Sequence, residues 1–260
     1  MGAPVAWLGR ALTSALGRRG PFVLCYHGVG EVTPESDPHG LFVSRELFTR
    51  HLDAIEEHGY RLLTVSELWR QLERDPQSRH IGAISFDDGL VKTVREAMPI
   101  LHERKMPSSM YVPSGLLGGP HPDMAQESII SNSELVDLAA SGVEVGAHTV
   151  DHLMLTELSY SEMLDQLSRS RLTLGKLLSA EVSTMAYPFG ALDEQTIRAA
   201  SESGYETACG CSGPGPWQAL NIPREPVFPA TNTRRLTLKM TGLYGPVHRA
   251  RKLQSKVRGR

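Results

Sequence analysis

The stretch IGAISFDDG, residues 81–89, joins a largely apolar run to two adjacent aspartates and a glycine. The apolar run has the length and composition of a buried strand, and Gly89 is typical of the turn that follows one. One acid suits such a turn, but two neighbouring carboxylates repel each other and are costly to hold beside an apolar strand. Asp87 and Asp88 therefore mark either an ordinary turn or chemistry at the end of the strand.

The rest of the chain alternates between short apolar runs and longer stretches with helical periodicity. Three helical stretches end in a glycine that leads directly into a strand, in EEHGYRLL, AASGVEVG and SESGYETA. A glycine after a helix allows a left-handed cap, and the repeated rhythm predicts parallel βα units. Six or seven such units predict an α/β fold, a (β/α) barrel of about seven strands. The predicted strands are 22–26, 60–65, 81–86, 108–113, 143–148, 183–188 and 205–210, and the predicted helix caps include Ser44, Ser66, and Asn132 or Ser133.

Ionisable side chains follow several of these predicted strands. His27 follows the first strand, Asp87 and Asp88 follow the third, and His148 and His152 follow the strand at 143–148. In such barrels functional groups lie at the carboxyl ends of the strands, so we expect these side chains to meet at one opening.

One aspartate and two histidines suit a divalent metal that keeps open coordination positions. The second aspartate is then free to act as a base, and the cation relieves the repulsion between the two acids. Each feature alone has a plainer interpretation: a turn for DDG, surface histidines for HTVDH, and a structural side chain for His27. Their joint placement after separate strands favours a metal site.

The motifs resemble those of a known family. SFDDG (85–89) and HTVDH (148–152) are similar to the first two motifs of the polysaccharide deacetylases, the NodB-homology domain of carbohydrate esterase family 4. AYPFG (186–190) resembles the third motif. LCYHGV (24–29), residues 48–68 and IPREPV (222–227) resemble the branch with a Tyr-His element near its N-terminus, so the resemblance covers roughly residues 22–228. These motifs indicate the fold and the metal site, and they do not indicate the substrate.

The resemblance implies a distorted (β/α) barrel that hydrolyses N-acetyl groups from sugars, commonly with zinc. Metal-activated water would attack the amide, with an aspartate as base and a histidine as acid. By motif position the implied roles are Asp87 as general base, Asp88, His148 and His152 as metal ligands, His27 as general acid, the Phe189 N–H as an oxyanion donor, and Thr149 as a brace for the second motif. Cobalt, nickel or iron would also suit these ligand types.

One position departs from the common family pattern. Many members have an arginine that holds the catalytic base where this chain has Ala186. Arg224 in IPREPV is the candidate replacement, and the alternative is a surface arginine beside a proline turn.

Two other functions stay open at this stage. One is a metal-dependent hydrolase of a small non-sugar amide on the same scaffold, since only 6% of the residues are aromatic and the surface for sugar stacking looks sparse. The other is a non-catalytic carbohydrate-binding pseudoenzyme, which the missing arginine at Ala186 motivates.

Composition and charge limit the classes of binding partner and suggest how the chain is divided into segments. With 260 residues and a net charge of −2, the chain as a whole does not indicate a nucleic-acid partner. We expect an N-terminal helical extension at 1–20, a catalytic domain at 21–230 and a basic C-terminal tail at 231–260. Residues 248–260 are rich in Lys and Arg and contain no acid, which suits either a solvated tail or contact with an anionic surface.

The sequence also suggests a location. Cys25, Cys209 and Cys211 do not form a disulfide framework, which favours a reducing compartment. The N-terminus shows helical spacing of Val5, Leu8, Leu12 and Leu16 and lacks the pattern of a signal peptide. That segment suits either a membrane-surface helix or a helix packed on the domain. We therefore expect a cytoplasmic protein that acts on an N-acetylated carbohydrate, with its termini as candidates for contact with the inner face of the membrane.

Overall fold

The computed structural model describes residues 19–124, 126–211 and 217–243, and its centre is one curled parallel sheet. Seven strands follow the order β10-β1-β5-β6-β7-β8-β9, and β4 pairs with β5 beside that path. Every ladder in this sheet is parallel. The strands are β1 (Phe22–Tyr26), β4 (Arg61–Leu63), β5 (Ile81–Phe86), β6 (Ser109–Val112), β7 (Glu144–Ala147), β8 (Thr184–Ala186), β9 (Thr207–Cys209) and β10 (Glu225–Pro226). The predicted α/β barrel is confirmed.

The two edges of the curled sheet approach each other through the segment that precedes β10. Cys209 in β9 forms a parallel bridge with Ile222, and β10 pairs with β1. This closure places Arg224 between the two edges, where its side chain is buried.

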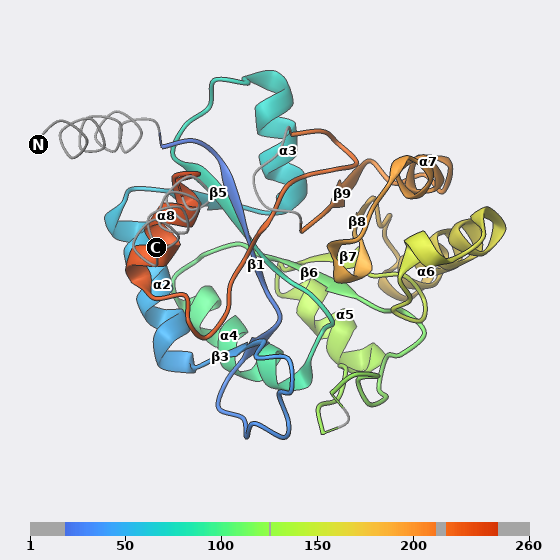
Figure 1. The fold of residues 1–260 in the computed structure, drawn as a ribbon, viewed down its shortest axis with the longest axis horizontal. Helices are drawn as coiled ribbons and strands as arrows, with labels where there is room; N and C mark the ends of the chain where they lie inside the picture. The colour runs from blue at the N-terminus through green and yellow to red at the C-terminus, as the bar shows by residue number, and fades with distance from the viewer. Residues whose placement is uncertain (1–18, 125, 212–216, 244–260) are drawn as a thin grey trace, which may run out of the picture.

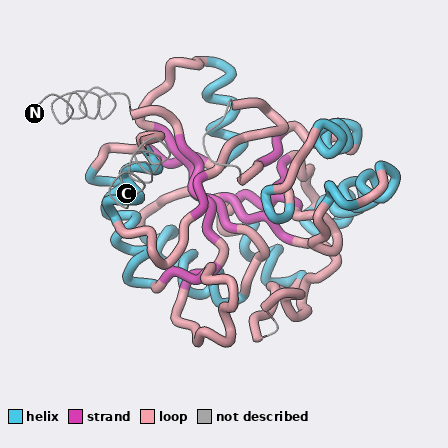
Figure 2. Tube along the Cα trace, in the orientation of Figure 1, coloured by secondary structure: helices cyan, strands magenta, loops and turns pink. Residues whose placement is uncertain are grey.

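Helices surround the sheet, as Figures 1 and 2 show. A second, two-stranded parallel sheet joins β2 to β3 beside the end of β1. The helices are α2 (Arg45–Glu57), α3 (Val65–Arg74), α4 (Val91–Glu103), α5 (Asn132–Ala140), α6 (Tyr160–Leu178), α7 (Glu194–Glu202) and α8 (Thr233–Met240), with short 3₁₀ turns η1 (Leu155–Glu157) and η2 (Pro188–Gly190) and the small strands β2 (Gly28–Val29) and β3 (Phe42–Val43). None of the helices in the described part of the chain is long and apolar enough to cross a bilayer.

Alternate side chains of the strands supply two layers of core. Leu24 in β1 and Ile84 in β5 belong to the large core that the helices cover. Their neighbours Val23 and Ala83 belong to a smaller cluster with Tyr111. Because both faces of β1 and β5 are buried, these two strands read as largely continuous apolar runs rather than alternating ones.

The predicted glycine caps are confirmed. Gly59, Gly142 and Gly204 have φ values of 69°, 95° and 84°, in the left-handed region that a side chain disfavours. Each one ends a helix and turns the chain toward the next strand, as the repeated pattern predicts.

Two predicted helix caps were wrong by two residues or fewer. Helix α3 is capped by Thr64 rather than Ser66, because Thr64 and Glu67 form a reciprocal capping box. Helix α5 is capped by Ser131 with Glu134 in the same arrangement, rather than by Asn132 or Ser133. In both cases the pairing with a glutamate three residues later selects the earlier residue.

The packed domain continues past the boundary predicted at residue 230. Helix α8 buries Leu236 and Met240 in the main core and packs on α2. The Tyr60 hydroxyl also donates to the Met240 carbonyl. Residues 231–243 are therefore part of the domain and not of a tail. Residues 1–18 of the extension predicted at 1–20, and residues 244–260 of the predicted tail, lie outside the described residues.

Candidate active site

The carboxyl ends of β1, β5 and β7 bring most of the predicted residues together. His27 follows β1, Asp87 and Asp88 follow β5, and His148 follows β7, which leads through a tight turn to His152. Parallel strands end at one edge, so these side chains converge there. Two groups result: Asp88 with histidines, and Asp87 with Arg224 and His27.

The first group is centred on the Asp88 carboxylate. Its Oδ1 atom lies 3.3 Å from His152 Nε2 and 3.6 Å from His148 Nε2. All three residues are buried. The predicted ligand set is thus assembled in one place.

Hydrogen bonding determines which nitrogen of His148 faces this group. Its Nδ1 lies 2.8 Å from the Ala186 carbonyl oxygen. A carbonyl only accepts, so Nδ1 carries the proton and donates it. The Nε2 lone pair is then directed toward Asp88, which is the state that a metal ligand needs.

A third histidine, His121, lies at the same carboxylate and was missed in the sequence. Its Nε2 is 3.4 Å from Asp88 Oδ2, and the residue is buried. Asp88, His121 and His152 each bring one ligand atom within 4.8 Å of the other two. His121 belongs to the loop between β6 and α5, where no strand end marks it in the sequence.

The electrostatics keep this group ready to bind a cation at neutral pH. Burial, with a further contribution from His148, lowers the pKa of His152 to about 4, so its ring is neutral. Burial alone would raise the pKa of Asp88, but the His121 ring next to its Oδ2 and the charges of the other nearby histidines outweigh it and hold that pKa well below its usual range.

Three buried atoms of the group have no hydrogen-bond partner within the described part of the chain: Asp88 Oδ1, His121 Nε2 and His152 Nδ1. A buried polar atom without a partner is costly, and a carboxylate oxygen more than most. A divalent cation at Asp88 Oδ1 would satisfy that oxygen, and the nitrogen and oxygen donors suit zinc. The residues therefore fit a metal of the type that the sequence predicts.

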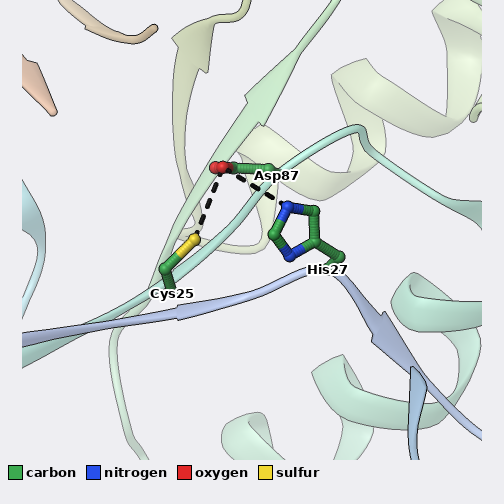
Figure 3. Close-up of side chains that lie close together, drawn as sticks. All are labelled: Cys25, His27 and Asp87. Carbon is green, nitrogen blue, oxygen red and sulfur yellow. Dashed lines mark hydrogen bonds and ion pairs between the residues drawn. The ribbon is translucent and has the colours of Figure 1, made fainter. Parts of the chain in front are cut away.

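The second group is centred on Asp87, which is paired with Arg224. Arg224 Nη1 donates to Oδ1 at 2.6 Å and Nη2 donates to Oδ2 at 2.8 Å. The Cys25 thiol also donates to Oδ2 at 3.4 Å, and His27 Nε2 lies 4.0 Å from it. Figure 3 shows the carboxylate held between Cys25 and His27.

Arg224 is held from several sides, so the surface alternative for this residue was wrong. Its side chain is fully buried and donates to the Gly210 carbonyl and to Ser85 Oγ. Its guanidinium also lies 5.5 Å from the centre of the Tyr111 ring. The predicted contact between Arg224 and the acid is confirmed, and Ala186, where many family members have an arginine, is a buried residue of β8.

This second group suits a metal less well than the first, although Cys25, His27 and Asp87 have atoms close enough for one. Both Asp87 oxygens already accept from Arg224, whose charge opposes a second cation nearby. A hydrogen bond with Cys211, together with burial, raises the pKa of the Cys25 thiol, so it keeps its proton. For Asp87, burial would raise the pKa, and the Arg224 guanidinium outweighs this and lowers it.

Backbone strain is concentrated around the two groups. Of the seven non-glycine residues with positive φ in the described part of the chain, four lie in the motifs: Asp88, Thr149, His152 and Phe189. Such conformations cost about 1–3 kcal/mol each and persist where the surroundings fix them. The predicted brace is present, because the His152 N–H donates to Thr149 Oγ1 at 3.0 Å. The Phe189 ring is 56% exposed and lies 4.8 Å from the His152 ring.

Comparison with known families agrees with this geometry. The family model described as polysaccharide deacetylase matches residues 74–208, which is more than half of the chain. The chain belongs to the polysaccharide deacetylase family. The resemblance read from the three motifs is thereby confirmed.

Several relatives in this family are named for related activities. The chain is 25% identical to a putative polysaccharide deacetylase, YxkH, of Bacillus subtilis over 71% of its length and 62% of that protein. It is 23% identical to a poly-beta-1,6-N-acetyl-D-glucosamine N-deacetylase of Staphylococcus aureus over 62% of its length and 58% of that protein. The chain thus spans about three fifths of the length of these polysaccharide deacetylase relatives.

Solved structures share the fold. A deacetylase of Streptococcus pyogenes, PplD, solved with acetate, superposes with a TM-score of 0.74 at 22% identity, covering 84% of this chain and 97% of that one. IcaB of Ammonifex degensii superposes with a TM-score of 0.74 at 24% identity, covering 85% and 97%. These matches support the barrel as the family fold.

Proposed function

We propose that this member of the polysaccharide deacetylase family is a metal-dependent hydrolase that removes N-acetyl groups from an N-acetylated sugar or polysaccharide. The proposal rests chiefly on two adjacent acids at the end of β5 that have different surroundings. Asp88 faces histidines and has an unsatisfied buried oxygen, while Asp87 is locked to Arg224 beside His27. One acid is suited to a metal and its neighbour to proton transfer.

The substrate class rests on the relatives. The Staphylococcus aureus relative is named for poly-beta-1,6-N-acetyl-D-glucosamine, and other members of the family are named for polysaccharides. A β-1,6-linked polymer of N-acetylglucosamine is therefore the first substrate to test.

The metal would be held by Asp88, His148 and His152, with zinc as the first candidate. Hydrogen bonding already aims the His148 Nε2 lone pair at Asp88, and His152 is neutral at physiological pH. When bound, such an ion supplies Lewis acidity that polarises the amide carbonyl and acidifies a water molecule.

Asp87 acts as the general base in this proposal. Its lowered pKa means that it is ionised at neutral pH and able to accept a proton from the attacking water. Arg224 and Cys25 fix the direction of its oxygens, so the carboxylate loses little freedom when it reacts.

His27 acts as the general acid that protonates the departing amine. Its Nε2 lies 4.0 Å from Asp87 Oδ2 across the opening, and its side chain is 22% exposed, so it can reach both solvent and substrate. The Phe189 N–H would donate to the oxyanion, with its backbone held in a left-handed conformation at φ 59°.

The proposal is tested by acetate release from partially acetylated and fully acetylated β-1,6-glucosamine oligomers. We expect zinc-dependent release by the wild type and a loss of about 10²–10⁴-fold in rate for Asp87→Asn, because a general base contributes about that much. The variant should retain its metal, which elemental analysis measures. Wild-type turnover by Asp87→Asn, or loss of its metal, would contradict the assigned roles of the two acids.

The cytoplasmic location and the membrane contact stay predictions. The segments that carry them, 1–18 and 244–260, lie outside the described residues. Cell fractionation with a tagged chain tests both, and a protein found outside the cell would contradict them.

A further inference from the structure

The loop between β6 and α5 forms a compact hairpin that carries His121. Pro120 bridges Ser128 in an antiparallel pair, and the His121 N–H donates to the Glu127 carbonyl at 2.9 Å. The Ile129 N–H donates to the Gly119 carbonyl at 2.9 Å. His121 is thus placed by its own backbone pairing.

This hairpin is attached to the turn that carries Asp88. The Ile130 N–H donates to the Gly89 carbonyl at 2.9 Å, and Leu90 bridges Ile129. The buried Glu127 carboxylate also pairs with Lys92 of α4 at 3.0 Å. His121 and Asp88 therefore lie on two segments that are held as one unit.

The tautomer of His121 is opposite to that of His148. The Asp123 backbone N–H donates to His121 Nδ1 at 3.1 Å, so Nδ1 is the accepting nitrogen. In a neutral imidazole the other nitrogen then carries the proton. His121 Nε2 then carries the proton, lies 3.4 Å from Asp88 Oδ2, and has no lone pair for a metal.

We propose that His121 is a positioning residue that holds Asp88 Oδ2 through its Nε2–H, leaving Oδ1 alone to face His148 and His152. The inference rests on the proposed metal site. The geometry divides the two carboxylate oxygens in this way: Oδ1 is near His148 and His152, and Oδ2 is near His121. His121 Nε2 has no aligned partner among the described residues, and Asp88 Oδ2 at 3.4 Å is the acceptor that a small rotation of either side chain would bring into line. Partners of this kind orient ligands and increase metal affinity.

The test compares two variants with different hydrogen-bonding capacity. His121→Leu keeps the approximate volume and removes the donor. His121→Gln places an amide N–H near the former Nε2 position. The matched control is His102→Leu, an exposed histidine at the end of α4.

Zinc affinity of each purified full-length chain is measured by competition with a chromophoric chelator, and the visible spectrum is recorded with cobalt(II). We expect His121→Leu to bind zinc about 10–100-fold more weakly and His121→Gln to stay within about threefold of the wild type. The cobalt spectra of the three proteins should report the same coordination number, because His121 is not a ligand. Circular dichroism of the metal-free chains checks that both variants fold.

Two results would overturn the inference while leaving the proposed function intact. One is wild-type zinc affinity in His121→Leu. The other is an equal loss in both variants with a changed cobalt spectrum, which would make His121 a ligand. Absence of zinc binding by the wild type would overturn the proposed metal site, and this inference with it.

Discussion

The carboxylates at the two ends of the central sheet have different surroundings: Glu144 at one end is half-buried, and Asp88 at the other is buried. At the amino-terminal ends of β6 and β7, Glu144 accepts from Ser109 Oγ at 2.5 Å, from Thr64 Oγ1 at 3.3 Å and from the Ser66 N–H at 3.3 Å. At the carboxyl end of β5, Asp88 Oδ1 faces two histidines and accepts no hydrogen bond from any residue that the structure describes. A satisfied acid stabilises the fold, while an unsatisfied one indicates a bound ion or a reaction.

The left-handed backbone positions also differ between the two ends. At the ends of α2, α5 and α7 they are occupied by glycine, which adopts them at little cost, although Lys105 and Ser179 adopt them after α4 and α6. At the opening they are adopted by four residues of the motifs: Asp88, Thr149, His152 and Phe189. Substitutions at the opening should therefore affect the site, while substitutions at the amino-terminal end should affect stability alone.

The largest effect should come from breaking the buried pair at the opening. Arg224→Met leaves Asp87 charged and unpaired in the core, which typically costs about 3–5 kcal/mol. Urea unfolding at neutral pH measures the loss in the free energy of unfolding. A variant that fails to fold has lost more than this amount. The control is Arg169→Met, whose exposed pair with Asp165 should contribute no more than about 0.5 kcal/mol. Equal effects of the two substitutions would contradict a special status for the Asp87 pair.

A smaller effect should appear as pH dependence of the metal-free protein. The pKa of His152 is about 4 in the folded chain and about 6.5 in an unfolded one, so the unfolded chain binds more protons between these values. Stability from this histidine is present above pH 6.5 and is lost as the pH falls toward 4. Between pH 7 and 5 the wild type should lose up to about 2 kcal/mol more than His152→Gln. Urea unfolding midpoints of the two proteins, measured across this pH range with a chelator present, give the comparison. The same pH dependence of stability in both proteins would contradict the role assigned to His152.

The smallest effect should come from the amino-terminal end. Gly142→Ala puts a side chain at φ 95°, with no atom within 4 Å of the new Cβ, so the cost is backbone strain alone. We expect a loss of about 1–2 kcal/mol in urea unfolding and unchanged zinc affinity. A change in zinc affinity would show that the amino-terminal end of the sheet is coupled to the metal site, and would contradict the independence of the two ends.

The parts of the site that the sequence predicts are those that follow a strand directly. Strand periodicity alone locates these side chains. The two aspartates, Asp87 and Asp88, follow the apolar run of β5, His148 follows that of β7, and His152 comes within one turn. The pairing of Arg224 with Asp87 depends on closure of the sheet between distant segments, and only the family resemblance suggested it. The hairpin around His121 has no periodic pattern, and its contact with Asp88 arises from tertiary hydrogen bonds.

The parallel βα fold was predictable for a similar reason, but the C-terminal boundary of the domain was not. Helix–glycine–strand junctions have local signals, and these predicted parallel βα units in a barrel. Helix α8 combines Arg234, Arg235 and Lys239 with only a few apolar residues, so it reads as part of a basic tail. Its place in the domain depends on burial of Leu236 and Met240 against α2, which no local pattern shows.

The proposed metal site consists of Asp88, His148 and His152. Elemental analysis of the purified wild type, His152→Ala and the exposed control His102→Ala, each after incubation with zinc and removal of free ion, tests it most directly. We predict about one zinc per chain in the wild type and the control, and little in His152→Ala. Equal zinc in all three proteins, or none in the wild type, would contradict this assignment.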